Sequence, residues 1–437
     1  MAKFSYYNLI EKNPNGGFIL FNSLTKNIVL LTDEDYEWIT TTNLEDANEK
    51  DERFTTLLES NFIVDDDFDE YEYYKLAWNR SLYSSGILRH TVILNLACNC
   101  DCPYCFENKN GQFMTKDTAV AYLEWLEPQV KDIKYFYMSW FGGEPLLSKK
   151  MIEFITEGIL EMAEKYHFEY SACVVTNGVL ADKDFVSSCE RLHITNLQIT
   201  IDGEREIHNQ YRFLKANHGE TFDTILANLA DFCERVHSDV ATVLRVNLTD
   251  ENYLTIEKLL DEIPENVRKN CVLLFRWVYS HEEGRNPGME FSAEKKGVRP
   301  YENLAPLYEL AESKGFTTNS FDEGMSCNFC ECDFDHAFQI NYDGDLFMCT
   351  HSMDKSEIIG TVFDGFGSQR NLSRYARFIN TNPFSDPECI RCKLLPICKG
   401  GCRKARFLGH KVCSDVKYSL TSYIVQKAEK AIIDNND

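Results

Sequence analysis

Three cysteines, Cys98, Cys102 and Cys105, follow the apolar run Thr91–Leu96 with the spacing C-x3-C-x2-C. This spacing places three thiolates on one short loop. Thiolates bind soft metal centres, and iron–sulfur clusters are commonly held by four of them. Three ligands would leave one iron of a [4Fe–4S] cluster open to bind and activate a small molecule. A zinc site and a redox-active thiol pair are the alternative interpretations.

A second group of cysteines crowds the C-terminal part of the chain. Nine of the 17 cysteines lie between Cys327 and Cys413, and none precedes Cys98. No secretion signal opens the sequence, so we expect a reducing compartment, where cysteine clusters indicate metal sites rather than disulfides. Zinc is again an alternative, because C-x2-C pairs often bind it. The remaining thiols we interpret as inert core or bystander residues: Cys100, Cys173, Cys189, Cys233 and Cys271.

The bulk composition narrows the possible partners. The formal net charge is −24, which would repel nucleic acids and anionic membrane surfaces. We therefore expect no nucleic-acid partner and no membrane partner. No apolar run of about 18 residues is present, so the sequence predicts no membrane span and a cytoplasmic protein.

Strand-like apolar runs recur along the middle of the chain and alternate with helical patterns. The six runs are Thr91–Leu96, Tyr135–Trp140, Ser171–Val175, Leu197–Ile201, Ala241–Leu248 and Val272–Val278. Continuous apolar strands that alternate with helices are typical of a parallel sheet covered by helices. The sequence thus predicts an α/β fold, in which functional sites gather at the carboxyl ends of the strands.

Polar and glycine-rich positions follow several of these predicted strands. Residues 141–145 read Phe-Gly-Gly-Glu-Pro after the second strand, and Asn177 follows the third. Thr200 and Asp202 end the fourth strand, and Arg245 lies on the fifth. Each alone could be a turn residue or a satisfied polar group. Together with the cysteine loop they mark one edge of the sheet as the candidate site.

These motifs resemble those of the radical S-adenosylmethionine (SAM) enzymes, whose core is a partial (β/α)6 barrel. The resemblance implies that Cys98, Cys102 and Cys105 hold a [4Fe–4S] cluster whose free iron binds the amino and carboxylate groups of SAM. Tyr104 matches the family's aromatic position before the third cysteine. The implied SAM contacts are Gly142 and Gly143 to the ammonium with Glu144 in support, Asn177, Thr200 and Asp202 to the ribose, and Arg245 to the carboxylate.

In that family, reductive cleavage of SAM yields a 5′-deoxyadenosyl radical that abstracts hydrogen from unactivated carbon. The cofactor performs the difficult step, and the protein supplies binding and orientation. This fits the absence of a catalytic triad or an HExxH motif. The sequence does not identify a residue that completes the reaction after hydrogen abstraction, so the catalytic residue is left unassigned.

The front of the chain, residues 1–88, has a different pattern. Strands are predicted over 4–10, 18–21 and 27–31, and helices over 33–41 and about 44–60. This order predicts a winged-helix-like α+β module. Residues 20–25 and 32–35 resemble the peptide-recognition elements of radical SAM enzymes that modify ribosomal peptides, in which a precursor's leader segment adds a strand to a sheet edge. A structural cap on the next domain is the alternative.

After a predicted core domain of residues 89–300, with a linker at 284–300, residues 301–437 resemble the SPASM extension of such enzymes. The resemblance rests on Gly344-x4-Cys349 and on the C-x2-C-x5-C-x3-C spacing. It implies two auxiliary [4Fe–4S] clusters. One would use Cys349 and Cys402 with cysteines among Cys327, Cys330 and Cys332. The other would use Cys389, Cys392, Cys398 and Cys413.

Taken together, the sequence predicts a radical SAM enzyme with three clusters, SAM, a precursor peptide and an external electron donor. The expected reaction is a thioether or other side-chain or backbone crosslink in a ribosomally made peptide. The alternatives are formylglycine formation of the anaerobic sulfatase-maturing type and a non-catalytic protein that binds metal and peptide.

Overall fold

The computed structural model describes most of the chain and leaves a few segments outside it. The described residues are 2–45, 51–84, 86–105, 107, 110–236, 242–277, 304–318, 330–352, 354–411, 413, 417 and 420–434. The predicted linker at 284–300 and Cys327 fall outside these ranges.

Six parallel strands form the centre of the molecule. They are β6 (Ile87–Asn95), β7 (Tyr135–Gly142), β8 (Glu169–Thr176), β9 (Ile194–Thr200), β10 (Thr242–Leu248) and β11 (Cys271–Trp277). They lie side by side in sequence order, each parallel to the next. The predicted six-strand parallel sheet is therefore confirmed, and all six carboxyl ends meet at one edge.

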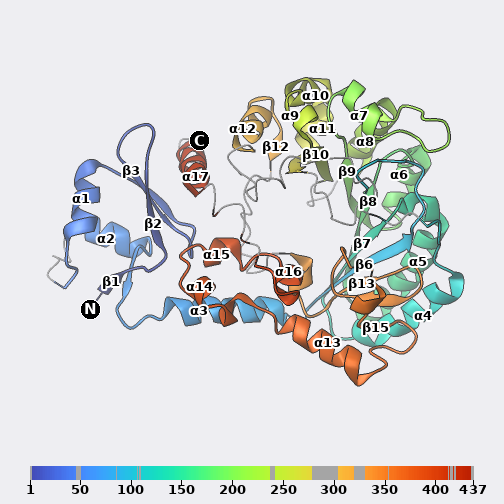
Figure 1. Ribbon diagram of the computed structural model, residues 1–437, viewed down its shortest axis with the longest axis horizontal. Coiled ribbons are helices and arrows are strands. Elements are labelled where there is room, and N and C mark those ends of the chain that lie inside the picture. Colours follow the sequence, from blue (N-terminus) through green and yellow to red (C-terminus); the bar gives the residue numbers. More distant parts are fainter. Residues whose placement is uncertain are drawn as a thin grey trace.

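Helices cover the outer face of this curved sheet (Figure 1). They include α4 (Lys116–Leu126), α5 (Lys149–Tyr166), α6 (Lys183–Cys189) and α8 (Phe222–Arg235). Thr115 begins α4 by accepting a hydrogen bond from the Thr118 N–H. Alternate strand residues such as Met138 and Trp140 are fully buried beneath the helices, so the opposite set of side chains faces the concave side.

The sheet continues beyond the six predicted strands into the cysteine-rich segment. β12 (Thr317–Thr318) pairs with β11, while β13 (Ala337–Ile340) pairs in parallel with β6. β13, β14 (Asp345–Phe347) and β15 (Gly360–Thr361) complete an open row of ten strands. β13 and β14 form an antiparallel hairpin, and Gly344 provides its turn with a φ of 86°.

The front module contains an antiparallel sheet of β2 (Asn8–Lys12), β3 (Phe18–Asn22) and β4 (Ile28–Leu31). The continuous strand predicted over 4–10 is wrong. It divides into β2 and β1 (Ala2–Phe4), which pairs instead with β5 (Ile63–Asp65). The break occurs because Glu70 accepts hydrogen bonds from Ser5 Oγ at 2.5 Å and from the Tyr6 N–H at 2.8 Å.

Both faces of this small sheet are covered. On one face, Leu20 and Leu31 pack with Phe54 and Leu57 of helix α2 (Glu52–Glu59), near helix α1 (Asp33–Thr41). On the other, Ile19 and Phe21 pack with Tyr423 and Ile424 of α17 (Leu420–Asp434). The C-terminal helix therefore completes the N-terminal module (Figure 1).

A helix that the sequence analysis missed, α3 (Glu70–Leu82), links the front module to the rest of the chain. Its buried residues Tyr74, Trp78 and Leu82 recur every four positions, which is a helical period. The Trp78 ring packs edge-on against Phe384, with 5.2 Å between ring centroids. Within the described part of the chain, no helix is long and apolar enough to cross a bilayer.

Replacing Tyr423 by alanine should loosen the front sheet. Tyr423 is 2% exposed, and its ring meets Phe21 edge-on at 5.8 Å. Emptying such a site costs on the order of 3 kcal/mol. Hydrogen exchange should accelerate in β2–β4 and stay unchanged in β6–β9. Tyr73→Ala, at a position that is 54% exposed, is the control. Unchanged protection of β2–β4 in Tyr423→Ala would contradict the docking of α17.

Candidate active site

The three predicted cluster cysteines lie on the loop that leaves the carboxyl end of β6. Cys98, Cys102 and Cys105 are each half-buried, whereas Cys100 between them is fully buried. The Cys98 sulfur accepts the Cys100 N–H at 3.4 Å, and the Cys105 N–H donates to the Cys102 carbonyl at 3.2 Å. The loop thus keeps three thiols partly accessible and buries the fourth.

The chemistry of this donor set fits an iron–sulfur cluster, which cysteine thiolates commonly hold. The Cys98 sulfur is approached by the Cys100 N–H and by Asn177 Nδ2, and hydrogen bonds to the sulfurs tune such clusters. Among the described residues, no three His, Cys, Asp or Glu side chains are arranged so that they could hold one metal ion.

The Gly-Gly-Glu-Pro segment packs directly on the backbone of the cysteine loop. The Gly143 N–H donates to the Asn95 carbonyl at 3.0 Å, and the Glu144 N–H donates to the Ala97 carbonyl at 2.8 Å. A Cβ at Gly142 would lie 2.3 Å from the Asn95 oxygen, and one at Gly143 would lie 2.2 Å from the Ala97 oxygen. Both positions therefore need glycine for contact between the two loops, whatever further contact they make with SAM.

Glu144 ties the second strand to the third. Its side chain is fully buried and accepts hydrogen bonds from Thr176 Oγ1 at 2.7 Å and from the Asn177 N–H at 2.8 Å. Burial raises the pKa of Glu144 to about 7, against these hydrogen bonds, which lower it. The Glu144 carboxyl group is thus a structural junction beneath the cysteine loop.

Asn177 contacts the cysteine loop itself. Its Nδ2 donates to Asn99 Oδ1 at 2.7 Å and lies 3.7 Å from the Cys98 sulfur. The third strand therefore reaches the predicted cluster, as the motif positions suggest. The predicted contact of Asn177 with ribose stays a prediction.

Asp202 joins Tyr104 of the cysteine loop to a residue that the sequence analysis missed, Arg212. Asp202 Oδ2 accepts from the Tyr104 hydroxyl and lies 3.4 Å from Arg212 Nη1, while Oδ1 accepts the Asn247 N–H at 3.1 Å. Arg212 ends α7 (Arg205–Tyr211) as its C-cap. The only sequence signal for Arg212 was a basic residue ten positions after Asp202. That spacing occurs too often by chance to identify a functional residue.

Arg245 lies on the concave face and pairs in register with Thr200 of β9. Its Nε donates to Asn247 Oδ1 at 2.8 Å, and burial together with nearby Arg276 lowers its pKa. Within the described residues, neither arginine forms an ion pair with a carboxylate. Two close cations without a bonded acid suit an anionic ligand. The predicted contact of Arg245 with the SAM carboxylate stays a prediction.

Four C-terminal cysteines lie in one neighbourhood. The Cys332 thiol interacts with those of Cys330 and Cys349, which raises the pKa of Cys332 and lowers the pKa of Cys349. Cys402 is close enough to Cys330 and Cys349 for their charges to act on it. Four neighbouring thiols have the chemistry of a cluster site. That Cys330 and Cys332 accompany Cys349 and Cys402 in one cluster stays a prediction, and Cys327 lies outside the described residues.

The second predicted auxiliary set is less closely defined. The Cys392 N–H donates to the Cys389 carbonyl at 3.0 Å, so these two residues share one turn. The Cys389 sulfur accepts from Arg406 Nη2 at 3.4 Å, and Cys413 lies 3.7 Å from Lys417 Nζ. That these residues and Cys398 bind one cluster stays a prediction from spacing.

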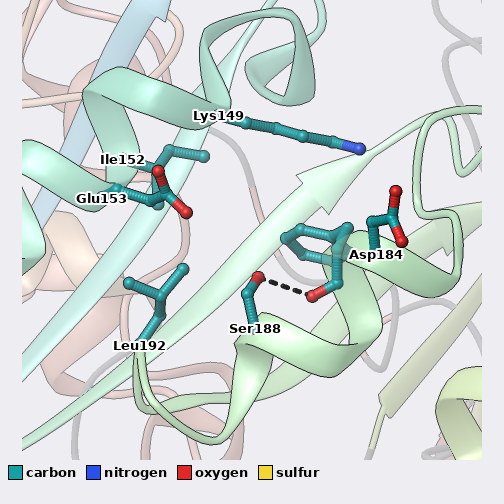
Figure 2. A pocket seen from close by; sticks show the side chains of 7 residues that line it. Lys149, Ile152, Glu153, Asp184, Ser188 and Leu192 are labelled. Carbon is teal, nitrogen blue, oxygen red and sulfur yellow. Dashed lines mark hydrogen bonds between the residues drawn. The ribbon is translucent and has the colours of Figure 1, made fainter.

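A separate small cavity, of about 140 Å³, lies between α5 and α6 on the outside of the barrel. Figure 2 shows Lys149 and Glu153 of α5 facing Asp184 and Ser188 of α6 across it. Its lysine is already engaged, because Lys149 Nζ forms an ion pair with Asp182 at 2.9 Å. None of the predicted site residues lines this cavity, so it plays no part in the candidate site.

Comparison with known protein families identifies the domain that contains the six-strand sheet. Residues 92–263 match the radical SAM superfamily. This chain contains a radical SAM domain. The match begins within β6 and ends just beyond α10 (Ile256–Glu262), so it includes the cysteine loop, the Gly-Gly-Glu-Pro segment and Asp202. Radical SAM proteins bind a [4Fe–4S] cluster and SAM.

Two curated relatives extend beyond the radical SAM domain. A cysteine-type anaerobic sulfatase-maturating enzyme of Clostridium novyi is 24% identical over 70% of this chain and 85% of its own length. The radical SAM cyclopropyl synthase TigE of Paramaledivibacter caminithermalis is 23% identical over 91% of this chain and 88% of its own length.

Solved structures agree at the level of fold. The enzyme anSMEcpe with bound AdoMet superposes with a TM-score of 0.58 at 19% identity, over 80% of this chain and 99% of its own. Streptococcus suis SuiB bound to precursor peptide SuiA gives a TM-score of 0.50 at 15% identity, over 92% of this chain and 95% of its own. The likeness to SuiB therefore includes the front of the chain.

Gly143→Ala should disrupt the cysteine loop, because the new methyl group would meet the Ala97 carbonyl oxygen at 2.2 Å. Overpacking of this kind costs about 1–3 kcal/mol. We expect lower iron and sulfide content after anaerobic reconstitution, measured per folded protein. Gly86→Ala is the control, since its Cβ would meet nothing within 4 Å. Wild-type iron content and SAM binding in Gly143→Ala would refute this contact.

Proposed function

We propose that this chain is a radical SAM enzyme that modifies a ribosomally synthesised peptide, forming a thioether or another side-chain or backbone crosslink. The observation that carries the proposal is an antiparallel front sheet with both faces covered, in the same chain as the three-thiol loop. Among the described residues, no further strand pairs with the outer side of β4. A sheet of this kind recruits an extended peptide through its edge.

The chain's own cysteines account for the cofactors of such an enzyme. Cys98, Cys102 and Cys105 would hold the SAM-binding cluster, with Tyr104 and Asn177 beside it. Cys330, Cys332, Cys349 and Cys402 would hold one auxiliary cluster, and Cys389, Cys392, Cys398 and Cys413 the other. When bound, the first cluster and SAM supply a carbon radical that removes hydrogen from unactivated carbon.

The concave face of the sheet is where the peptide would meet this chemistry. Its polar side chains come from alternate positions of neighbouring strands, such as Thr200 of β9 and Arg245 and Asn247 of β10. They lie on the same side as the cysteine loop. Among the solved relatives of this fold, SuiB has been captured with its precursor peptide SuiA, which supports a peptide substrate here.

The leader segment of that peptide would add a strand to β4. β2 and β4 are the edges of the front sheet, and β4 is the one that exposes a large apolar side chain, Leu30, at 45%. Backbone groups along an unpaired edge bind an extended chain by main-chain hydrogen bonds, and pockets beside it select side chains. An apolar residue in the leader would then contact Leu30.

The overall reaction balances without an external oxidant. Joining a carbon to a cysteine sulfur removes two hydrogen atoms from the peptide. Bound SAM would supply the acceptor for one of these hydrogen atoms, and the other would leave as a proton and an electron. That electron would make up for the one that the external donor provides at the start, so one SAM would be consumed for each crosslink.

Formylglycine formation of the anaerobic sulfatase-maturing type is the second candidate, because the Clostridium novyi relative is named a cysteine-type anaerobic sulfatase-maturating enzyme. That relative aligns with 70% of this chain, whereas TigE aligns with 91%. A sulfatase-maturing enzyme would act on a sulfatase peptide and would not depend on the β4 edge. The two functions thus differ in substrate and in the need for the front module.

The reaction itself tests the proposal. Anaerobically reconstituted protein should convert a short cysteine-containing precursor, encoded beside its gene, to a product lighter by two hydrogen atoms, with one 5′-deoxyadenosine per product. Cys98→Ala, Cys102→Ala and Cys105→Ala should each abolish both products, while Cys100→Ala should retain both. Production of formylglycine from a sulfatase peptide, with no change in the precursor, would favour the second candidate.

Leu30→Asp should weaken precursor binding by at least tenfold, because a carboxylate would be placed beside the bound leader. SAM cleavage in the absence of peptide should be unchanged. Leu372→Asp is the matched control, since Leu372 is 48% exposed on α13 (Gln369–Ile379), far from β4 in the sequence. Fluorescence anisotropy of a labelled leader measures the affinity. Equal affinities for Leu30→Asp and wild type would exclude this edge.

A further inference from the structure

The segment after α7 lies along the cysteine loop. The Asp101 N–H donates to the Phe213 carbonyl at 3.1 Å, and the Lys215 N–H donates to the Asn99 carbonyl at 2.8 Å. Cys100 and Leu214 form an isolated antiparallel bridge between these contacts. A loop without regular structure thereby gains a paired neighbour on one side, which limits how far its three thiols can move.

Arg212 begins this segment and extends the contact with a buried side chain. Its Nη1 donates to the Tyr104 hydroxyl at 2.7 Å and lies 3.4 Å from Asp202 Oδ2. The side chains of Arg212 and Asp202 are only 10% and 2% exposed. Arg212 Nε is also buried and has no hydrogen-bond partner among the described residues, so one donor of the cation is left for another group.

The charge of Arg212 acts on the predicted cluster ligands. Burial alone would lower the pKa of Arg212, but Tyr104, Cys102 and Asp202 together hold it well above its ordinary value. Charges interact strongly where water is excluded. A reduced cluster carries one more negative charge than an oxidised one, so a nearby buried cation stabilises the reduced form and a nearby carboxylate destabilises it.

We propose that Arg212 is a positioning and tuning residue of the SAM-binding cluster. It anchors the cysteine loop through Tyr104, and its positive charge raises the reduction potential of the cluster while Asp202 opposes it. The inference rests on the proposed ligation of a [4Fe–4S] cluster by Cys98, Cys102 and Cys105. Arg212 touches none of the reacting atoms and acts through the loop and the electrostatic field.

The test is a redox titration of the full-length, anaerobically reconstituted protein, followed by EPR. The signal that changes on addition of SAM identifies the SAM-binding cluster among the three. Removing the cation in Arg212→Met should shift its potential downward, and removing the anion in Asp202→Asn should shift it upward. Arg212→Lys, which keeps the charge, should lie closer to wild type than Arg212→Met does.

Arg205→Met is the matched control at the other end of α7. Arg205 is paired with Asp223 and Glu262 and is 42% exposed, so water screens its charge and the potential should not move. If Arg212→Met folds but loses the iron of this cluster, the anchoring role is supported, and Asp202→Asn then decides the tuning role.

Two outcomes would overturn the inference, and they differ from failure of the proposed function. Unchanged potentials in Arg212→Met and Asp202→Asn, with the cluster retained, would refute the tuning role alone. Shifts of the two variants in the same direction would also refute it. If wild-type protein shows no SAM-sensitive cluster signal at all, the proposed function itself fails.

Discussion

Three thiols must stay open on a loop that has no regular structure of its own, and much of the surrounding structure meets this constraint. The Gly-Gly-Glu-Pro segment holds the loop backbone by donating hydrogen bonds to the carbonyl groups of Asn95 and Ala97. The loop is held from the side by residues 213–215 and from the third strand by Asn177. Each restraint comes from the carboxyl end of a strand or from the connection after it, which is why a parallel sheet suits this chemistry.

The restraints also place charged groups where water cannot reach them. Glu144, Asp202 and Arg212 are buried, and Tyr104 beside them is half-buried. Burial of unpaired charges is costly. The cost is offset because each carboxylate accepts backbone or side-chain hydrogen bonds and Arg212 faces Asp202. Such networks contribute less to stability than to a unique geometry, and here that geometry fixes the loop on which the chemistry depends.

Much of the fold was predictable from the sequence because the signals are local. Six apolar runs predicted six strands, and the spacing of Cys98, Cys102 and Cys105 marked the site at the end of the first. The misses depend on contacts between distant residues. The first strand breaks because Ser5 and Tyr6 bond Glu70, 65 and 64 positions away. β13 pairs with β6 across a long stretch of chain, and the role of Arg212 depends on its contacts with Tyr104 and Asp202. No local sequence pattern specifies contacts between residues that lie so far apart in the chain.

The open iron is the central claim, and one measurement tests it most directly. EPR of the reduced, oxygen-free protein should show a [4Fe–4S] signal that changes when SAM is added. Isotope labelling of the SAM amino and carboxylate groups should give hyperfine coupling to that signal. A signal indifferent to SAM, or zinc in place of iron at Cys98, Cys102 and Cys105, would contradict the account.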